Sequence, residues 1–181
     1  YWKFSEGGGS ITADSSGYGN DGTLGNSSVG DIYEPQWVDG KFGKALSFDG
    51  VDDYVNVGNP SSLQITGDLT VSFWAYPNNV STHRQNPIGK TYSGEFALTI
   101  EPTGELSYYH GQSASNYMWC KCPGMFVNKQ WVFVTVVRDI DTHTIKFYRN
   151  GNLQSSSCGD WVDPSMSINN FRIGYVYGNT Q

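Results

Sequence analysis

The protein has 181 residues, a length that fits one domain, and a formal net charge of −6 from 17 acidic and 11 basic residues. This balance argues against nucleic acid as a partner, because phosphate binding needs a cationic surface. The longest apolar run, 131–137, is far too short for a membrane-spanning helix, so no membrane insertion is expected. Because the chain begins with Tyr1 rather than Met, we expect a processed product or an excised domain.

Alternation of apolar and polar residues, which is typical of half-buried strands, recurs along the chain. It predicts strands at 45–48, 54–57, 69–76, 96–100, 106–110, 131–137, 144–148 and 170–175. The 131–137 segment is β-branched and aromatic, so we expect a central strand covered on both faces. Asn150-Gly151 predicts a tight hairpin turn, and residues 139–142 predict another. Together these strands predict one domain over residues 1–181, an all-β antiparallel sandwich of two sheets.

Two segments resemble a known family most specifically. They are residues 1–24, YWKFSEGGGSITADSSGYGNDGTL, and residues 40–55, GKFGKALSFDGVDDYV. Later segments in the same order also fit: LTVSFWAYP at 69–77, WVFVT at 131–135 and IKFYRNG at 145–151. The chain is therefore similar, over nearly its whole length, to laminin-G-like, concanavalin A-like lectin/glucanase domains. This resemblance implies a jelly-roll sandwich.

The resemblance also implies a closing strand after the segment 171–174. The chain stops at Gln181 before that strand is complete, so we expect the closing C-terminal strand to be missing. Either the sequence is truncated or a neighbour supplies the strand, since an open sandwich exposes a strand edge.

A cation site is predicted near the N-terminus. The glycine-rich loop 14–22 contains Asp14 and Asn20, and Ca²⁺ prefers carboxylate, amide and carbonyl oxygens. The resemblance implies a structural Ca²⁺ held by this loop and by the Asp49-Gly50 turn. The alternative is that Asp14 and its neighbour Asp21 are turn residues that bond their own backbone.

Catalysis is not predicted. Glycosidases need two carboxylates on one side of a site, and the scattered glutamates do not place two acids on one face of any expected strand. Asp52 and Asp53 are adjacent at a strand start, so we expect their side chains to point to opposite faces. The histidines lie beside no nucleophile motif. We therefore expect a protein that is not an enzyme.

Three cysteines, Cys120, Cys122 and Cys158, allow one disulfide. The two thiols of a Cys-x-Cys pair are poorly placed to bond each other, so Cys158 is expected to pair with Cys120 or with Cys122. A disulfide indicates an oxidising compartment, which favours an extracellular or cell-surface location.

The aromatic residues give the main functional indication. Tyr109, Tyr117 and Trp119 lie among small polar residues, and a disulfide from Cys158 would bring Trp161 near them. Sugar rings stack on such side chains, so we expect a glycan-binding platform. The alternative is that these rings pack the core or cover the open edge of the sandwich, which is the role expected for Trp2, Trp74 and Trp131.

The sequence therefore favours a non-catalytic, extracellular carbohydrate-binding module with a structural Ca²⁺ and a glycan or polysaccharide partner. The alternative function is a structural or adhesive surface subunit. Such a subunit would bind protein partners, or form a homo-oligomer, through its open sandwich edge.

Overall fold

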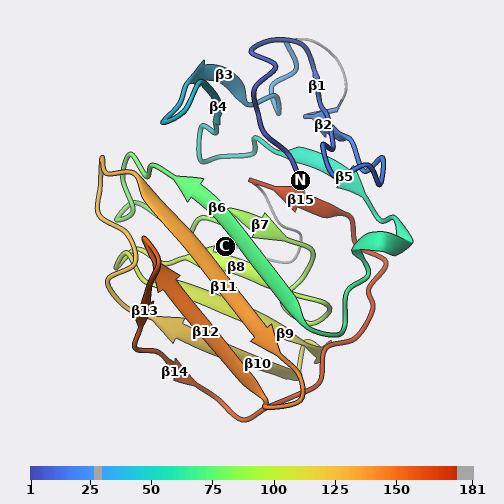
Figure 1. Ribbon diagram of the computed structural model, residues 1–181, viewed down its shortest axis with the longest axis vertical. Coiled ribbons are helices and arrows are strands. Elements are labelled where there is room, and N and C mark those ends of the chain that lie inside the picture. The colour runs from blue at the N-terminus through green and yellow to red at the C-terminus, as the bar shows by residue number, and fades with distance from the viewer. Residues whose placement is uncertain (27–29, 175–181) are drawn as a thin grey trace.

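The computed structural model describes residues 1–26 and 30–174. Its only helix in that part of the chain is a short 3₁₀ turn, Ser61–Leu63, and the strands are antiparallel, which confirms the predicted all-β sandwich (Figure 1). The strands are β1 (Ile11–Thr12), β2 (Gly22–Leu24), β3 (Gln36–Asp39), β4 (Lys44–Ser47), β5 (Val55–Gly58), β6 (Leu69–Ala75), β7 (Ile88–Gly89), β8 (Ala97–Ile100), β9 (Leu106–Ser113), β10 (Asn116–Cys122), β11 (Val132–Asp139), β12 (Thr144–Arg149), β13 (Asn152–Gln154), β14 (Ser157–Cys158) and β15 (Phe171–Ile173).

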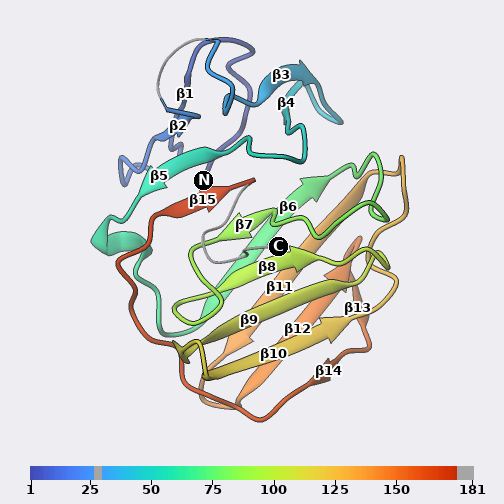
Figure 2. The same ribbon diagram turned by 180° about the vertical axis from the view of Figure 1, so that it is seen from behind.

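Within the described residues the strands form two packed sheets and a separate hairpin. The large sheet has the order β1-β2-β5-β15-β7-β8-β9-β10-β14, and the small sheet has the order β13-β12-β11-β6. Figures 1 and 2 show the small sheet lying across the β7–β10 part of the large sheet, with the β3–β4 hairpin beyond the end of β6. Each sheet therefore has an inner face toward the other sheet and an outer face toward solvent.

The core lies between the two inner faces. Val134 and Phe147 of the small sheet are fully buried, and so are Leu98 and Tyr108 of the large sheet. On β11 buried and half-buried residues alternate strictly. The expectation that this segment is covered on both faces is therefore wrong, because only the inner face of the small sheet has a second sheet against it.

The predicted hairpins are confirmed. β11 and β12 are joined through residues 140–143, and β12 and β13 through Asn150 and Gly151, whose φ angles are 51° and 82°. Positive φ at both central positions matches the twist of paired strands, and Asn-Gly adopts it at low cost. The strand predicted at 170–175 corresponds to β15. Position 175 lies outside the described residues, and so does the expected site of the missing closing strand.

A disulfide joins Cys120 to Cys158. The two cysteines are direct cross-strand partners of β10 and β14, which fixes their pairing and leaves Cys122 as a buried free thiol. Burial raises the pKa of Cys122 to about 11, so this thiol stays protonated near neutral pH.

A buried polar cluster connects the two sheets. Arg138 on β11 is 1% exposed and donates hydrogen bonds to the Tyr108 hydroxyl and to the backbone carbonyls of Ile65, Gly67 and Glu95. Tyr108 in turn lies 3.0 Å from Nδ1 of His110, which is also fully buried. Buried polar groups are stable only when their hydrogen bonds are formed, so this cluster fixes how the sheets pack.

No helix among the described residues has the length and apolar character needed to cross a bilayer.

Candidate functional site

An aromatic surface covers part of the outer face of the large sheet. Tyr109 on β9 and Trp119 on β10 are direct cross-strand partners, and Tyr117 precedes Trp119 by two residues. Because side chains alternate along a strand, these three rings lie on one face. Their neighbours Tyr108 and Met118 point into the core and are buried.

The tyrosine rings of this surface contact one another through Tyr117 and are not coplanar. The centroids of Tyr109 and Tyr117 are 6.3 Å apart with a 48° angle between the planes. Tyr92, from the loop after β7, places its ring edge-on to Tyr117 at 5.2 Å. Tyr117 is 39% exposed. We call Tyr92, Tyr109, Tyr117 and Trp119 the large-sheet aromatic surface.

Charged groups border this surface in balanced pairs. Glu101 accepts hydrogen bonds from Arg84 Nε at 3.0 Å and from the Tyr109 hydroxyl at 3.3 Å. Burial raises the pKa of Tyr109, and the nearby Glu101 carboxylate raises it further, so the hydroxyl remains a donor. Lys121 places its ammonium 5.4 Å from the centroid of the Trp119 ring. The surface thus offers stacking rings, donors and acceptors with little net charge.

Gly159 allows the β14 segment to lie close to Trp119. A Cβ atom at position 159 would come within 3.2 Å of the Trp119 indole nitrogen, and the Gly159 N–H donates to the Trp119 carbonyl. The disulfide between Cys120 and Cys158 holds the same segment in place. The indole therefore lies on a rigid part of the sheet.

Trp161 occupies a different place from the other predicted platform residues. Its ring stacks on His143 at 4.8 Å and meets His110 edge-on at 4.7 Å, and it packs against the core cluster. Its indole N–H donates to Asp163. The disulfide does not set this ring on the large-sheet aromatic surface with Tyr109, Tyr117 and Trp119.

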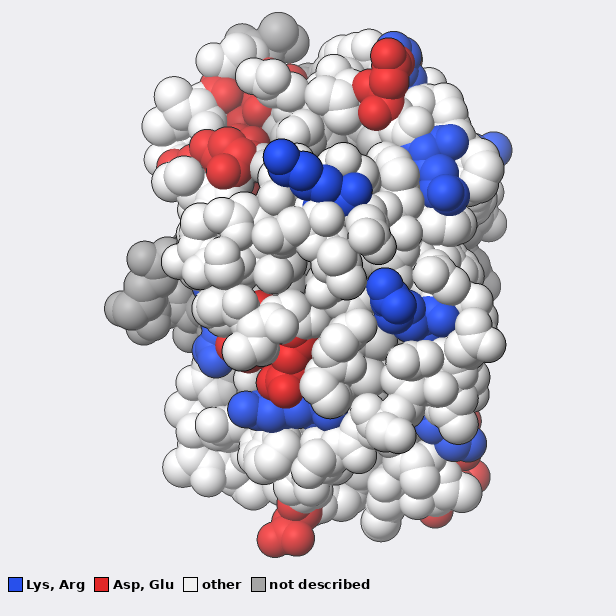
Figure 3. Space-filling model, turned by 90° about the vertical axis from the view of Figure 1, so that its left-hand side faces the viewer, with Lys and Arg blue, Asp and Glu red and all other residues white. Residues whose placement is uncertain are grey.

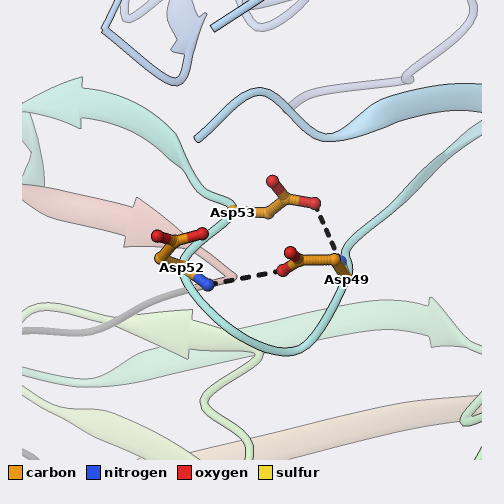
Figure 4. Close-up of side chains that lie close together, drawn as sticks. All are labelled: Asp49, Asp52 and Asp53. Atoms are coloured by element: carbon orange, nitrogen blue, oxygen red, sulfur yellow. Dashed lines mark hydrogen bonds between the residues drawn. The ribbon is translucent and has the colours of Figure 1, made fainter. Parts of the chain in front are cut away.

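Three carboxylates gather in the turn before β5. Oxygens of Asp49, Asp52 and Asp53 all lie within 4.8 Å of one another, and Figure 4 shows the three side chains around one turn. The Asp49 N–H donates to Asp53 at 2.8 Å, and the Asp52 N–H donates to Asp49 at 3.3 Å. The expectation that Asp52 and Asp53 diverge is wrong. β5 begins only at Val55, so the strand alternation on which it rested does not apply.

The electrostatics of this turn favour a cation. Burial raises the pKa of Asp53, and the neighbouring Asp49 and Asp52 carboxylates raise it too, against one backbone hydrogen bond that lowers it. Carboxylates held this close repel one another, and a bound divalent ion relieves the repulsion. Their donor chemistry, all oxygen, fits Ca²⁺.

The other predicted calcium ligands are engaged elsewhere. Asp14 accepts hydrogen bonds from the N-terminal amine and from the backbone of Ser16 and Asn20, and these bonds outweigh desolvation to hold its pKa well below the usual range. Asn20 Oδ1 accepts a hydrogen bond from Ser62. Gly50 offers a carbonyl beside the acidic turn, yet His83 Nε2 lies 2.6 Å from it. The loop 14–22 therefore has the hydrogen bonds of an ordered turn, and this is the alternative role expected for Asp14.

The three tryptophans expected in the core or over the open edge have different environments. Trp2 stacks on Phe171 at 5.5 Å and packs against the core, as predicted. Trp74 instead lies on the outer face of the small sheet and is 40% exposed, so it does not pack the core. Trp131 is half-buried and lines a hollow together with Trp74.

Charge is dispersed on the side of the molecule seen in Figure 3. Lysine, arginine, aspartate and glutamate side chains stand singly or in small groups among uncharged residues, without an extended basic patch on this side. Of the glutamates in the described residues, Glu95 is buried in a pair with Lys90, and Glu101 is paired with Arg84.

Solved structures share this fold. Domain 4 of the extracellular GH43 arabinanase AbnA from Geobacillus stearothermophilus, solved in complex with arabinotriose, superimposes with a TM-score of 0.64 at 19% identity over 92% of this chain and 79% of that one. The CBM40 domain of the Ruminococcus gnavus IT-sialidase gives a TM-score of 0.51 at 14% identity over 64% of this chain and 68% of that one. A sequence search among curated proteins returns no match.

A family model matches most of the sequence. The model described as the concanavalin A-like lectin/glucanases superfamily (Laminin_G_3) covers residues 49–181, so its match begins at the acidic turn and includes the whole large-sheet aromatic surface. These residues make up well over half of the chain. The protein therefore belongs to the concanavalin A-like lectin/glucanase superfamily, as the resemblance of its sequence implied.

Proposed function

We propose that the protein is a non-catalytic, extracellular carbohydrate-binding module whose ligand lies on the large-sheet aromatic surface. The observation that carries this proposal is the set of neighbouring rings of Tyr109, Tyr117 and Trp119 on one solvent-facing side of the large sheet. The apolar C–H faces of sugars stack on such rings, and Glu101, Arg84 and Tyr109 supply hydrogen-bonding groups for hydroxyls.

The ring geometry favours a soluble glycan chain. The planes of Tyr109 and Tyr117 are tilted by 48°, and Tyr92 stands edge-on to Tyr117. A flat crystalline polysaccharide would need coplanar rings, whereas a twisted single chain can follow tilted ones. Because the bordering charges are paired, we propose a neutral oligosaccharide. The arabinotriose in the complex of the arabinanase domain makes arabinan a first probe.

Replacing Trp119 with alanine is expected to weaken binding of a neutral oligosaccharide at least about tenfold, because stacking residues at the centre of a site carry most of the affinity. The measurement is isothermal titration with arabinotriose and with oligosaccharides of xylan, galactan and mannan. The matched control is Tyr18→Ala, an exposed ring on the N-terminal loop, which should leave affinity within about twofold.

The fold must survive this change for the result to count. Trp119 is half-buried, so the melting temperature of Trp119→Ala is compared with that of the wild type, and Trp119→Phe serves as a milder second variant. Equal affinity in the wild type and in both variants would show that this surface is not the site.

We further propose that the acidic turn of Asp49, Asp52 and Asp53 binds a structural Ca²⁺. The support is the close approach of three carboxylates, together with the raised pKa of Asp53. Of the ligands expected from the sequence, Asp49 belongs to this set of three carboxylates, whereas Asp14 and Asn20 do not.

Asp53→Asn tests the ion. In chelator this variant should melt at the same temperature as the wild type or above it, because it removes a repelled charge while its amide oxygen still accepts the Asp49 N–H. With Ca²⁺ at about 10–100 times a millimolar-range Kd, the wild type should gain about 1.4–2.7 kcal/mol and the variant nothing. Asp39→Asn, at an exposed carboxylate of β3, is the control. If Ca²⁺ raised both melting temperatures equally, the proposed site would be wrong.

One observation favours a second function, that of a structural or adhesive subunit. Among the described residues, β6 is the last strand of the small sheet and pairs only with β11, so its other edge offers backbone groups to a strand from a neighbour. A stable monomer in sedimentation equilibrium would exclude the homo-oligomeric form of this function.

A further inference from the structure

The outer face of the small sheet carries a second aromatic surface. Trp74 on β6 and Phe133 on β11 are direct cross-strand partners, with ring centroids 5.2 Å apart. The adjacent pair, Phe73 and Val134, points the other way, and Val134 is fully buried in the core. Because neighbouring positions of a strand face opposite sides, Trp74 and Phe133 face solvent.

The loop between β3 and β4 completes this surface. The ring centroids of Phe42 and Trp74 are 5.6 Å apart in an edge-to-face arrangement, and Lys41 places its ammonium 4.8 Å from the centroid of the Trp74 ring. Phe42 is 74% exposed. Figure 1 shows the β3–β4 hairpin beyond the end of β6, and the contacts of Phe42 and Lys41 with Trp74 join these two segments, which are far apart in the sequence.

Lys41, Trp74 and Phe133 border a hollow of about 470 Å³ that is also lined by Trp131, Asn150 and Gly151, which we call the Trp74 shelf. Asn150 uses its side-chain oxygen to accept the Phe133 N–H at 2.9 Å. The amide NH₂ group of Asn150 is thus its remaining donor toward a ligand.

The charge of the shelf indicates what it binds. Within the part of the chain that the structure describes, Lys41 forms no salt bridge, and no acidic residue lines the hollow. The shelf is therefore locally cationic in a protein whose net charge is −6. On the large-sheet aromatic surface, by contrast, Arg84 and Glu101 are paired. A cation over exposed rings is complementary to an anion that also has an apolar face.

We propose that the Trp74 shelf is a second binding site, specific for an anionic saccharide. A sugar ring stacks on Trp74 and Phe133, its carboxylate or sulfate group pairs with the Lys41 ammonium, and a hydroxyl accepts a hydrogen bond from the Asn150 amide. Since the two sites lie on opposite outer faces of the sandwich, one molecule can hold a neutral and an anionic chain at once.

The test follows the tryptophan indole N–H signals in ¹⁵N spectra, each assigned by a Trp→Phe variant. The probes are tetragalacturonate, its carboxyl-reduced neutral form, and a sulfated galactan tetrasaccharide. We expect at least one charged probe to shift the Trp74 and Trp131 signals saturably, with the neutral form at least about tenfold weaker. The two charged probes distinguish a carboxylate ligand from a sulfate ligand.

The variants separate charge from packing. Lys41→Gln should weaken binding of the charged probe at least about tenfold, whereas Lys44→Gln, from the same hairpin but paired with Asp39, should stay within about twofold. Lys41 is on an exposed turn, so its replacement is not expected to affect folding. The proposal is overturned if neither charged probe binds, if the shifts appear at Trp119 instead, or if Lys41→Gln binds normally.

These experiments distinguish a failure of this proposal from a failure of the proposed function. Loss of anionic binding with retained, Trp119-dependent binding of a neutral oligosaccharide would refute the shelf alone. Retained, Lys41-dependent binding of a charged probe without Trp119-dependent binding of a neutral oligosaccharide would refute the large-sheet site alone.

Discussion

Replacing Arg138 with methionine is expected to lower the free energy of unfolding by about 3–5 kcal/mol, the largest effect among these predictions. The guanidinium donates to the carbonyls of Ile65, Gly67 and Glu95, and it is almost completely excluded from water. Methionine fills much of the same space but leaves these carbonyls without the guanidinium donors, including the carbonyl of the fully buried Glu95. Each unsatisfied buried acceptor costs about 1–3 kcal/mol.

Urea denaturation measures this loss. Arg138→Lys should recover part of it, because an ammonium can satisfy some of the carbonyls but not all of them. Arg84→Met is the matched control, since Arg84 is half-exposed and its bond to Glu101 is worth at most about 1 kcal/mol. A loss below about 1 kcal/mol for Arg138→Met would mean that the buried cluster does not hold the sheets together.

Acidification is expected to destabilise the protein through His110. Burial and the nearby Arg138 charge together lower the pKa of His110 to about 4, and the Val162 backbone and Asp163 oppose this only in part. The unfolded chain has the ordinary value of about 6.5, so below this pH the unfolded state binds a proton that the folded state does not. Stability therefore falls as the pH drops from about 6.5 to about 4, and this contribution is constant outside that window.

The matched variant is His110→Gln, which keeps a hydrogen-bonding group next to Tyr108 but does not titrate. Between about pH 7 and about pH 4.5 the wild type should lose roughly 2–3 kcal/mol more unfolding free energy than the variant. Titration of Asp14 and Asp53 is common to both proteins and cancels in this comparison. Parallel pH profiles would show that the pKa of His110 is the same in the folded and unfolded states, and would contradict this prediction.

Local patterns in the sequence predict much of the fold. The alternation from Leu69 to Ala75 corresponds to β6, and Asn150-Gly151 forms the expected turn between β12 and β13. β10 was not predicted as a strand. Two of its residues, Asn116 and Lys121, have weak strand preference, and the strand is held by pairing with β9 on one side and β14 on the other. Pairing between distant segments is what local propensity cannot show.

The candidate site, like the fold, could be predicted from the sequence only in part. Three of the four expected platform residues lie on one face, since the spacing of Tyr117 and Trp119 follows the strand period. The alternation of β6 already placed Trp74 on the face opposite the apolar residues Val71 and Phe73, and the structure follows this local pattern rather than the expectation of a core position. The choice between Cys120 and Cys122 required the register of β10 and β14, which only the tertiary structure supplies.

The acidic turn was mispredicted for a backbone reason. Asp52 and Asp53 were expected to alternate as strand residues, but the chain there is still turning, and hydrogen bonds to Asp49 and from it draw the carboxylates together. The start of a strand is a boundary that apolar alternation locates only within a few residues.

The most direct test of carbohydrate binding on the large sheet is a titration of the ¹⁵N-labelled protein with the neutral oligosaccharide panel, observed at the Trp119 indole N–H. The account predicts a saturable shift of the Trp119 signal with at least one neutral oligosaccharide, which is lost in Tyr109→Ala and retained in Tyr18→Ala. An unchanged Trp119 signal at high concentrations of every oligosaccharide would contradict the proposed site.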